Sequence, residues 1–143
     1  MACPYFYPVE RHAWDTSLRS ALLPLGDAWT GLCQASPAAA WEPEDALLQT
    51  QCALGYARGV CPRFPAADAG PDAVRFSIAG DDGASLRLYY VLERDHLPFA
   101  HGPLEYSLRS GRFACALAPG IFSRQAEAYI QSYLRRKNEA SGR

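Results

Sequence analysis

The stretch VRFSIAGDDGASLRLYYVL, residues 74–92, decides the fold of this chain. Apolar residues at every second position before residue 79 indicate a strand with one buried face. Gly80-Asp-Asp-Gly83 is typical of a turn. Alternation then resumes at Leu86, Leu88, Tyr90 and Leu92. The whole pattern predicts a β-hairpin.

Two more strands are expected after this hairpin. Leu104, Tyr106 and Leu108 alternate with polar residues, and the turn signal Ser110-Gly111 separates them from a second alternating set, Phe113, Cys115 and Leu117. The intervening segment contains His96, Pro98, His101 and Pro103, and its prolines favour a loop. We therefore expect a four-stranded antiparallel meander, with Cys115 buried as a small apolar residue.

The C-terminal segment predicts a helix that packs on this sheet. Apolar residues recur at helical spacing: Phe122, Ala126, Tyr129, Ile130 and Tyr133. The basic run at 135–137 is expected near the negative end of the helix dipole, and the tail 138–143 is expected to fray.

The first 66 residues show little periodicity. A short helix over 16–23 is one candidate. A stronger one begins at Pro43, passes through Cys52 and ends near Arg58, with Gly59 as its cap residue. The fold class is therefore α+β. We expect one domain over 1–143, in which a cysteine-rich, irregular, helix-containing part (1–66) joins a sheet with a C-terminal helix (72–143).

Composition limits the classes of function. The chain has 143 residues, 49% of them hydrophobic and 20% charged, with a net charge of −1. The near-zero net charge gives no argument for nucleic-acid binding. Neither a membrane-spanning run nor a secretory signal is recognisable, so we expect a cytoplasmic protein whose thiols stay reduced and which has no membrane partner.

Four of the five cysteines lie in the irregular part, at Cys3, Cys33, Cys52 and Cys61. Two of them, Cys3 and Cys61, are followed directly by proline, and a cap at Gly59 would bring Cys61 back toward Cys52. Free cysteines are often simply buried. Because three of these four occur in loop-like sequence, the pattern favours a shared four-cysteine metal site.

The spacing bears on the metal. Structural zinc sites usually take two ligands from a tight Cys-x2-4-Cys turn, and this chain has none. A [4Fe–4S] cluster also takes four thiolates, and Cys-Pro is a feature of ferredoxin ligand runs. The favoured expectation is therefore a [4Fe–4S] cluster bound by Cys3, Cys33, Cys52 and Cys61, with zinc as the alternative.

Three functions stay open at this stage. The first is a small, non-catalytic iron–sulfur protein with an electron-transfer, redox-sensing or structural role and a redox or protein partner. The second is a zinc-stapled, non-catalytic module that binds a protein or nucleic acid. The third is a metal-free enzyme or ligand-binding domain that uses Cys115 or the pair His96 and His101.

Overall fold

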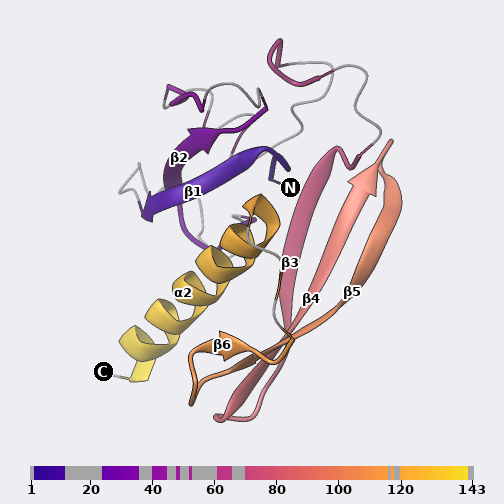
Figure 1. The fold of residues 1–143 in the computed structure, drawn as a ribbon. Helices are drawn as coiled ribbons and strands as arrows, with labels where there is room; N and C mark the ends of the chain where they lie inside the picture. Colours follow the sequence, from indigo (N-terminus) through magenta and orange to yellow (C-terminus); the bar gives the residue numbers. More distant parts are fainter. Residues whose placement is uncertain are drawn as a thin grey trace.

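The computed structural model describes residues 2–11, 24–35, 40–44, 48, 52, 61–65, 70–115, 117 and 120–141. In these residues the chain forms two antiparallel sheets and a long C-terminal helix. Figure 1 shows the helix lying between the smaller sheet and the larger one. The predicted α+β class is confirmed.

The larger sheet is the predicted meander. It contains β3 (Ala73–Asp81), β4 (Ser85–Arg94), β5 (Leu97–Ser107) and β6 (Arg112–Phe113), hydrogen-bonded in that order. The β3–β4 turn forms as its sequence indicates, because Gly83 adopts a φ of 83° that other residues tolerate poorly. The Asp82 carboxylate accepts hydrogen bonds from the backbone N–H groups of Ala84 and Ser85 at 2.9 and 2.7 Å.

The prediction of a loop between the second and third strands is wrong. β4 passes into β5 through the two residues Asp95 and His96, whose φ angles of 54° and 62° match a tight hairpin turn. Pro98 and Pro103 then lie within β5. They are tolerated because β5 pairs with β6 at just two positions, so most of its outer edge carries no described strand.

The fourth strand is much shorter than expected. β6 ends at Phe113, and Cys115 is exposed rather than buried. The Ala114 N–H still bonds the Glu105 carbonyl at 2.8 Å, after which the chain leaves the sheet toward the helix. Alternation at Cys115 and Leu117 therefore does not mark a strand.

The helix α2 spans Ile121–Ser141. Gly120 is the N-cap residue, and its carbonyl accepts the first intrahelical hydrogen bond, from the Arg124 N–H at 3.1 Å. The Ser123 hydroxyl oxygen accepts the Gly120 N–H at 3.2 Å and so caps the first turn.

The predicted apolar stripe of α2 faces the larger sheet. Ala126 and Ile130 are buried, and Phe76 of β3 stacks on Phe122 with ring centroids 5.6 Å apart. Tyr129 contacts the same Phe76 ring at 5.8 Å. The helix therefore closes the core above β3 and β4.

The expectation for the end of α2 is wrong. The helix continues to Ser141, and its last turn contains no basic residue. Instead of meeting the dipole, Arg135 forms a two-point ion pair with the buried Asp27. Lys137 donates to Asp81 at the end of β3 at 2.8 Å.

The smaller sheet was not anticipated. β1 (Phe6–Arg11) pairs with β2 (Trp29–Cys33), with a bulge at Val9. The close approach requires Gly31, where a Cβ would lie 2.0 Å from the Tyr7 carbonyl oxygen. Neither strand has a clear alternation of apolar and polar residues. Each also contains a residue that is uncommon in strands, proline in β1 and glycine in β2.

The two predicted N-terminal helices fall mostly outside the described residues. Segment 16–23 lies entirely outside them. Of the segment from Pro43 to Gly59, the structure describes Pro43, Glu44, Leu48 and Cys52. The Leu48 N–H bonds the Glu44 carbonyl at 3.0 Å, a helical separation.

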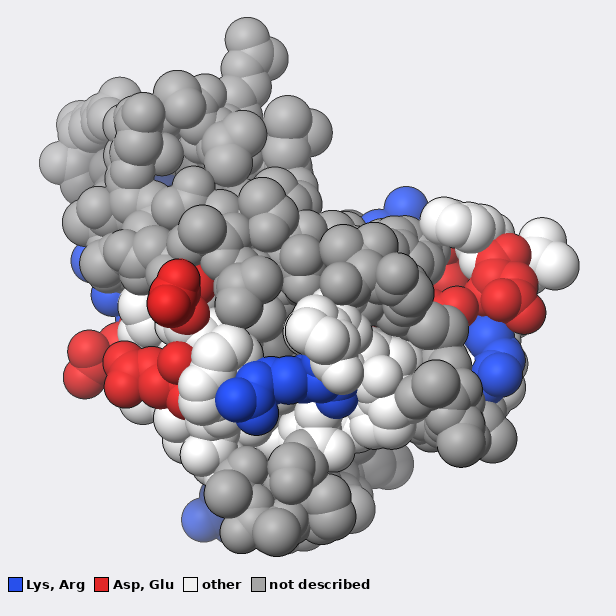
Figure 2. Space-filling view, turned by 90° about the horizontal axis from the view of Figure 1, so that it is seen from above, with Lys and Arg blue, Asp and Glu red and all other residues white. Residues whose placement is uncertain are grey.

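The surface carries mixed charge. On the face shown in Figure 2, acidic and basic side chains of the described residues occur in small neighbouring groups. Within the described part of the chain, no helix has the length and apolarity needed to cross a bilayer.

Replacing Phe76 by alanine should lower the free energy of unfolding by about 3–5 kcal/mol, because it removes a buried ring from between β3 and α2. Urea denaturation followed by circular dichroism measures this loss. Phe99, with 51% of its surface exposed, is the matched control, and Phe99→Ala should change the stability by less than about 0.5 kcal/mol. Equal losses in the two variants would contradict the packing described.

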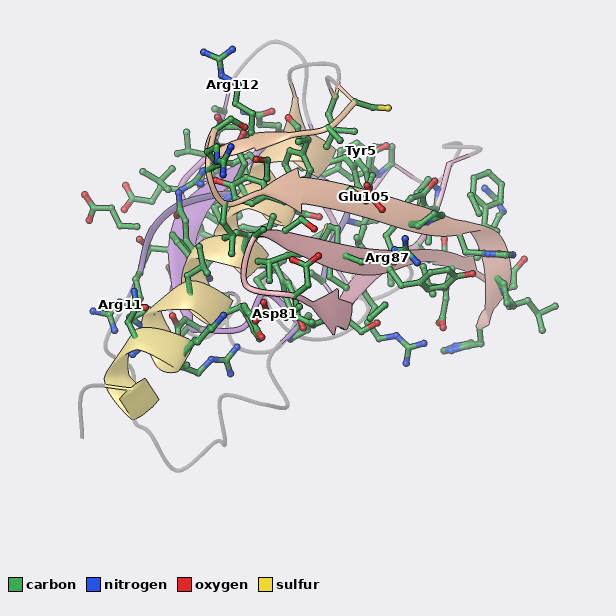
Figure 3. The ribbon with its side chains drawn as sticks, turned by 90° about the horizontal axis from the view of Figure 1, so that it is seen from below. Tyr5, Arg11, Asp81, Arg87, Glu105 and Arg112 are labelled. Atoms are coloured by element: carbon green, nitrogen blue, oxygen red, sulfur yellow. The ribbon has the colours of Figure 1, made fainter. Side chains whose placement is uncertain are left out.

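Asp81→Asn should lower the melting temperature at pH 7, and this difference should shrink toward pH 2. Hydrogen bonds from Lys137, Tyr133 and the Gly83 N–H lower the pKa of Asp81 from 3.8 to about 2. A lowered folded-state pKa means that the stabilisation is complete above the unfolded value and is lost as the pH falls through about 2. Thermal melts at both pH values test this. Glu105→Gln, which breaks an exposed ion pair with Arg87 (Figure 3), should have little effect at either pH.

Candidate metal centre

Two candidate ligands begin the same kind of turn. In Cys3-Pro4-Tyr5-Phe6 and in Cys61-Pro62-Arg63-Phe64, the cysteine carbonyl accepts the phenylalanine N–H three residues later, at 3.1 Å in both. Proline at the second position presets the backbone angle for such a turn. Each Cys-Pro sequence therefore fixes the backbone that carries its thiol.

Backbone bonds connect the first turn to the other candidate ligands. The Cys3 N–H donates to the Cys52 carbonyl at 2.9 Å. Cys33, the last residue of β2, pairs with Phe6 in the β1–β2 ladder, and its backbone exchanges two hydrogen bonds with Trp41. Three of the four candidate cysteines are thus positioned by backbone pairing around the Cys3 turn.

The pKa of the Cys3 thiol depends on its burial and on the other three candidate thiols. Burial raises the pKa of the Cys3 thiol to about 12, and the backbone N–H of Tyr5, which donates to the sulfur, partly offsets the rise. Charge on the other three thiols adds to it: Cys52, Cys33 and Cys61.

Cys52 reports the same neighbourhood. Its pKa is also raised to about 12, first by burial and then by charge on Cys33 and Cys61. The structure therefore brings the four predicted ligands into one neighbourhood.

The four cysteines differ in exposure. Cys3 and Cys52 are buried, with 6% and 7% of their surface exposed, whereas Cys33 and Cys61 are half-buried. The site thus has an inner side, which belongs to the core, and an outer rim close to the surface.

Aromatic residues lie in the same segments as the candidate ligands. The Tyr5 ring packs edge-to-face on Phe64 with centroids 5.3 Å apart, which brings the two Cys-Pro turns together. The Arg63 guanidinium lies 3.8 Å above the Trp41 ring, beside the strand end that carries Cys33. A positive charge is therefore held near the rim, where it would offset the negative charge of thiolate ligands.

The donor set suits a thiophilic metal, because all four candidate donors are thiols. They come from four separate segments of the chain. In the ranges that the structure describes, no three His, Cys, Asp or Glu side chains form a group tight enough to hold a metal ion. The four thiols thus share a neighbourhood without forming a preformed single-ion cage in those ranges.

The remaining sequence candidates lie elsewhere. Cys115 is exposed beyond β6, and His96 occupies the β4–β5 turn. His101 of β5 is exposed and hydrogen-bonds the Tyr89 hydroxyl through Nδ1.

Sequence reasoning missed Gln125. This α2 side chain has none of its surface exposed, and its Nε2 donates to the carbonyls of Cys3 at 2.8 Å and Phe6 at 2.7 Å. Both ends of the first Cys-Pro turn are therefore tied to the helix. The available signal was a polar residue within the apolar stripe, between Phe122 and Tyr129.

Comparisons of the chain with models of protein families, with curated proteins and with solved structures found no match. The function proposed below therefore rests on the residues of the site.

In the metal-free chain, Cys115 should react with iodoacetamide much faster than Cys3 or Cys52. Cys115 is exposed, whereas burial keeps the other two thiols inaccessible and protonated. A timed alkylation pulse at pH 8, digestion and mass spectrometry give the order, with a urea-unfolded sample as the control for intrinsic reactivity. Equal rates for Cys3 and Cys115 in the folded chain would contradict the burial described.

Proposed function

We propose that this α+β chain is a small iron–sulfur protein. In this proposal Cys3, Cys33, Cys52 and Cys61 bind one [4Fe–4S] cluster that serves electron transfer, redox sensing or the stability of the fold. The observation that carries the proposal is the arrangement of the first Cys-Pro turn, which bonds Cys52, pairs with the strand end at Cys33 and packs on the turn that begins at Cys61. In this arrangement charge on Cys33 and Cys61 raises the pKa of both buried thiols, Cys3 and Cys52. Cysteines that merely fill a core have no reason to gather in this way.

Three features favour a cluster over a single zinc ion. No two of the four cysteines form the tight turn from which zinc usually takes paired ligands. A polynuclear core accepts ligands from widely separated segments more easily. The Tyr5 N–H bond to the Cys3 sulfur is also of the kind that tunes the potential of iron–sulfur clusters.

The ligand count limits the chemistry. Four protein thiolates occupy the outward position of each iron, so no iron is left open to bind a substrate. The chain would therefore carry electrons, respond to oxidants or hold its own fold, rather than catalyse a reaction at the metal.

The rim suggests where a partner would act. Cys33 and Cys61 are half-buried, so electrons would enter or leave a cluster on their side more readily than through the buried Cys3 and Cys52. Exposed Arg63 lies on the same side and would attract an acidic redox partner.

Cys52→Ser and Cys61→Ser should each remove most of the bound iron and acid-labile sulfide after anaerobic purification. The expected readout is a brown wild-type protein with broad visible absorbance and a bleached variant, with iron and sulfide measured on the same samples. Cys115→Ser is the matched control, because it removes a cysteine outside the site, and it should keep the wild-type spectrum and iron content.

Three results would overturn the proposed cluster or its ligand set. A colourless wild-type protein with about one zinc per chain would establish the zinc-stapled module. Wild-type protein without iron or zinc would refute both metal proposals. Loss of colour in Cys115→Ser, with Cys52→Ser unaffected, would place the metal elsewhere.

A further inference from the structure

A cleft of about 290 Å³ lies where the first Cys-Pro turn, the β3–β4 pair and the start of α2 meet. Its walls come from three parts of the chain, and no lining side chain is charged: Pro4, Tyr5, Pro71, Val74, Leu92 and Phe122. Because a water molecule takes up about 30 Å³ in the liquid, one water would not fill this cleft. The cleft is therefore large enough for a small molecule, and its uncharged lining suits one that is itself uncharged and largely apolar.

Gln125 also lines the cleft, and its carboxamide is a buried polar group. Two carbonyl oxygens, those of Cys3 and Phe6, surround Nε2 and accept from it. This arrangement fixes the orientation of the amide, since the opposite orientation would set oxygen against oxygen.

The other end of this amide is unpaired. Gln125 Oε1 is buried and has no hydrogen-bond partner among the described residues. A buried acceptor left in this state is costly, and most buried polar groups avoid it. A ligand that brought a hydrogen-bond donor to Oε1 would remove that cost.

We propose that this cleft is a binding site for a small, neutral, apolar ring compound that carries one N–H or O–H donor. The ring packs between Leu92 and Phe122, and its donor meets Gln125 Oε1. The oxygen has almost no accessible surface, so binding includes a small outward movement of the lining side chains. The inference requires no metal, although one wall of the cleft is the turn that carries Cys3.

Indole and benzofuran test the site as a matched pair, because they share one shape while indole alone has an N–H donor. Isothermal titration calorimetry on the purified wild-type chain should show saturable binding of indole and roughly tenfold weaker binding of benzofuran. The methyl NMR signals of Val74 and Leu92 should shift with indole. Those of Val91, which points to the opposite face of β4, should not.

Two variants locate the interaction. Gln125→Met should equalise the two affinities, and circular dichroism reports whether that variant is folded. Leu92→Phe should weaken both ligands by filling the cleft, whereas Val91→Phe on the other face of the strand should not.

Three results would overturn the proposal. Equal affinities of the wild-type chain for indole and benzofuran would show that Oε1 accepts no hydrogen bond from the ligand, even if Gln125→Met fails to fold. Failure of both compounds to bind would mean that the cleft holds water only. Binding without methyl shifts at Val74 and Leu92 would place the compounds elsewhere.

Discussion

The first turn of the chain is the constraint on which the two parts of the structure depend. Residues 2–6 cannot fold alone, yet they meet three distant segments. Ala2 bridges Val74 of β3, Cys3 bonds Cys52, and the carbonyls of Cys3 and Phe6 receive the Gln125 amide. Displacing this short peptide would therefore disturb the larger sheet, the helix and the cysteine neighbourhood together. Stability and the candidate site are coupled through it.

The helix α2 makes that coupling specific by using two kinds of side chain. Toward the larger sheet it presents aromatic rings, whose burial supplies stability without much directional preference. Toward the N-terminal part it presents polar groups with defined partners. Arg124 donates to the Pro8 carbonyl, Ser132 accepts from Trp29, and Arg135 pairs with Asp27. Such bonds are lost if the two parts slide, so they set the relative position that apolar packing alone would leave loose.

Sequence patterns predicted the elements that depend on residues close together in the chain. The 74–92 hairpin and the helix followed from side-chain periodicity and turn residues. The segment with Pro98 and Pro103 was misassigned because prolines usually end strands, and their tolerance depends on a pairing edge that the sequence does not display. Cys115 was misplaced because alternation continued beyond the point where β6 stops pairing. The β1–β2 pair had no local signal at all.

The sequence proposed the four cysteines of the candidate site, and it did not indicate how the fold positions them. Proline after Cys3 and Cys61 marked both as turn-borne thiols, and the two turns indeed share one hydrogen-bond pattern. The two turns are joined by contacts between residues far apart in the chain, such as Tyr5 with Phe64, which no local spacing encodes. Those contacts also divide the site: Cys3 and Cys52 are held within the core, while Cys33 and Cys61 form the rim. In the proposed cluster, Cys3 and Cys52 would lie on the buried side and Cys33 and Cys61 on the accessible side. Electron exchange with a partner would use this asymmetry, whereas a purely structural staple would not need it.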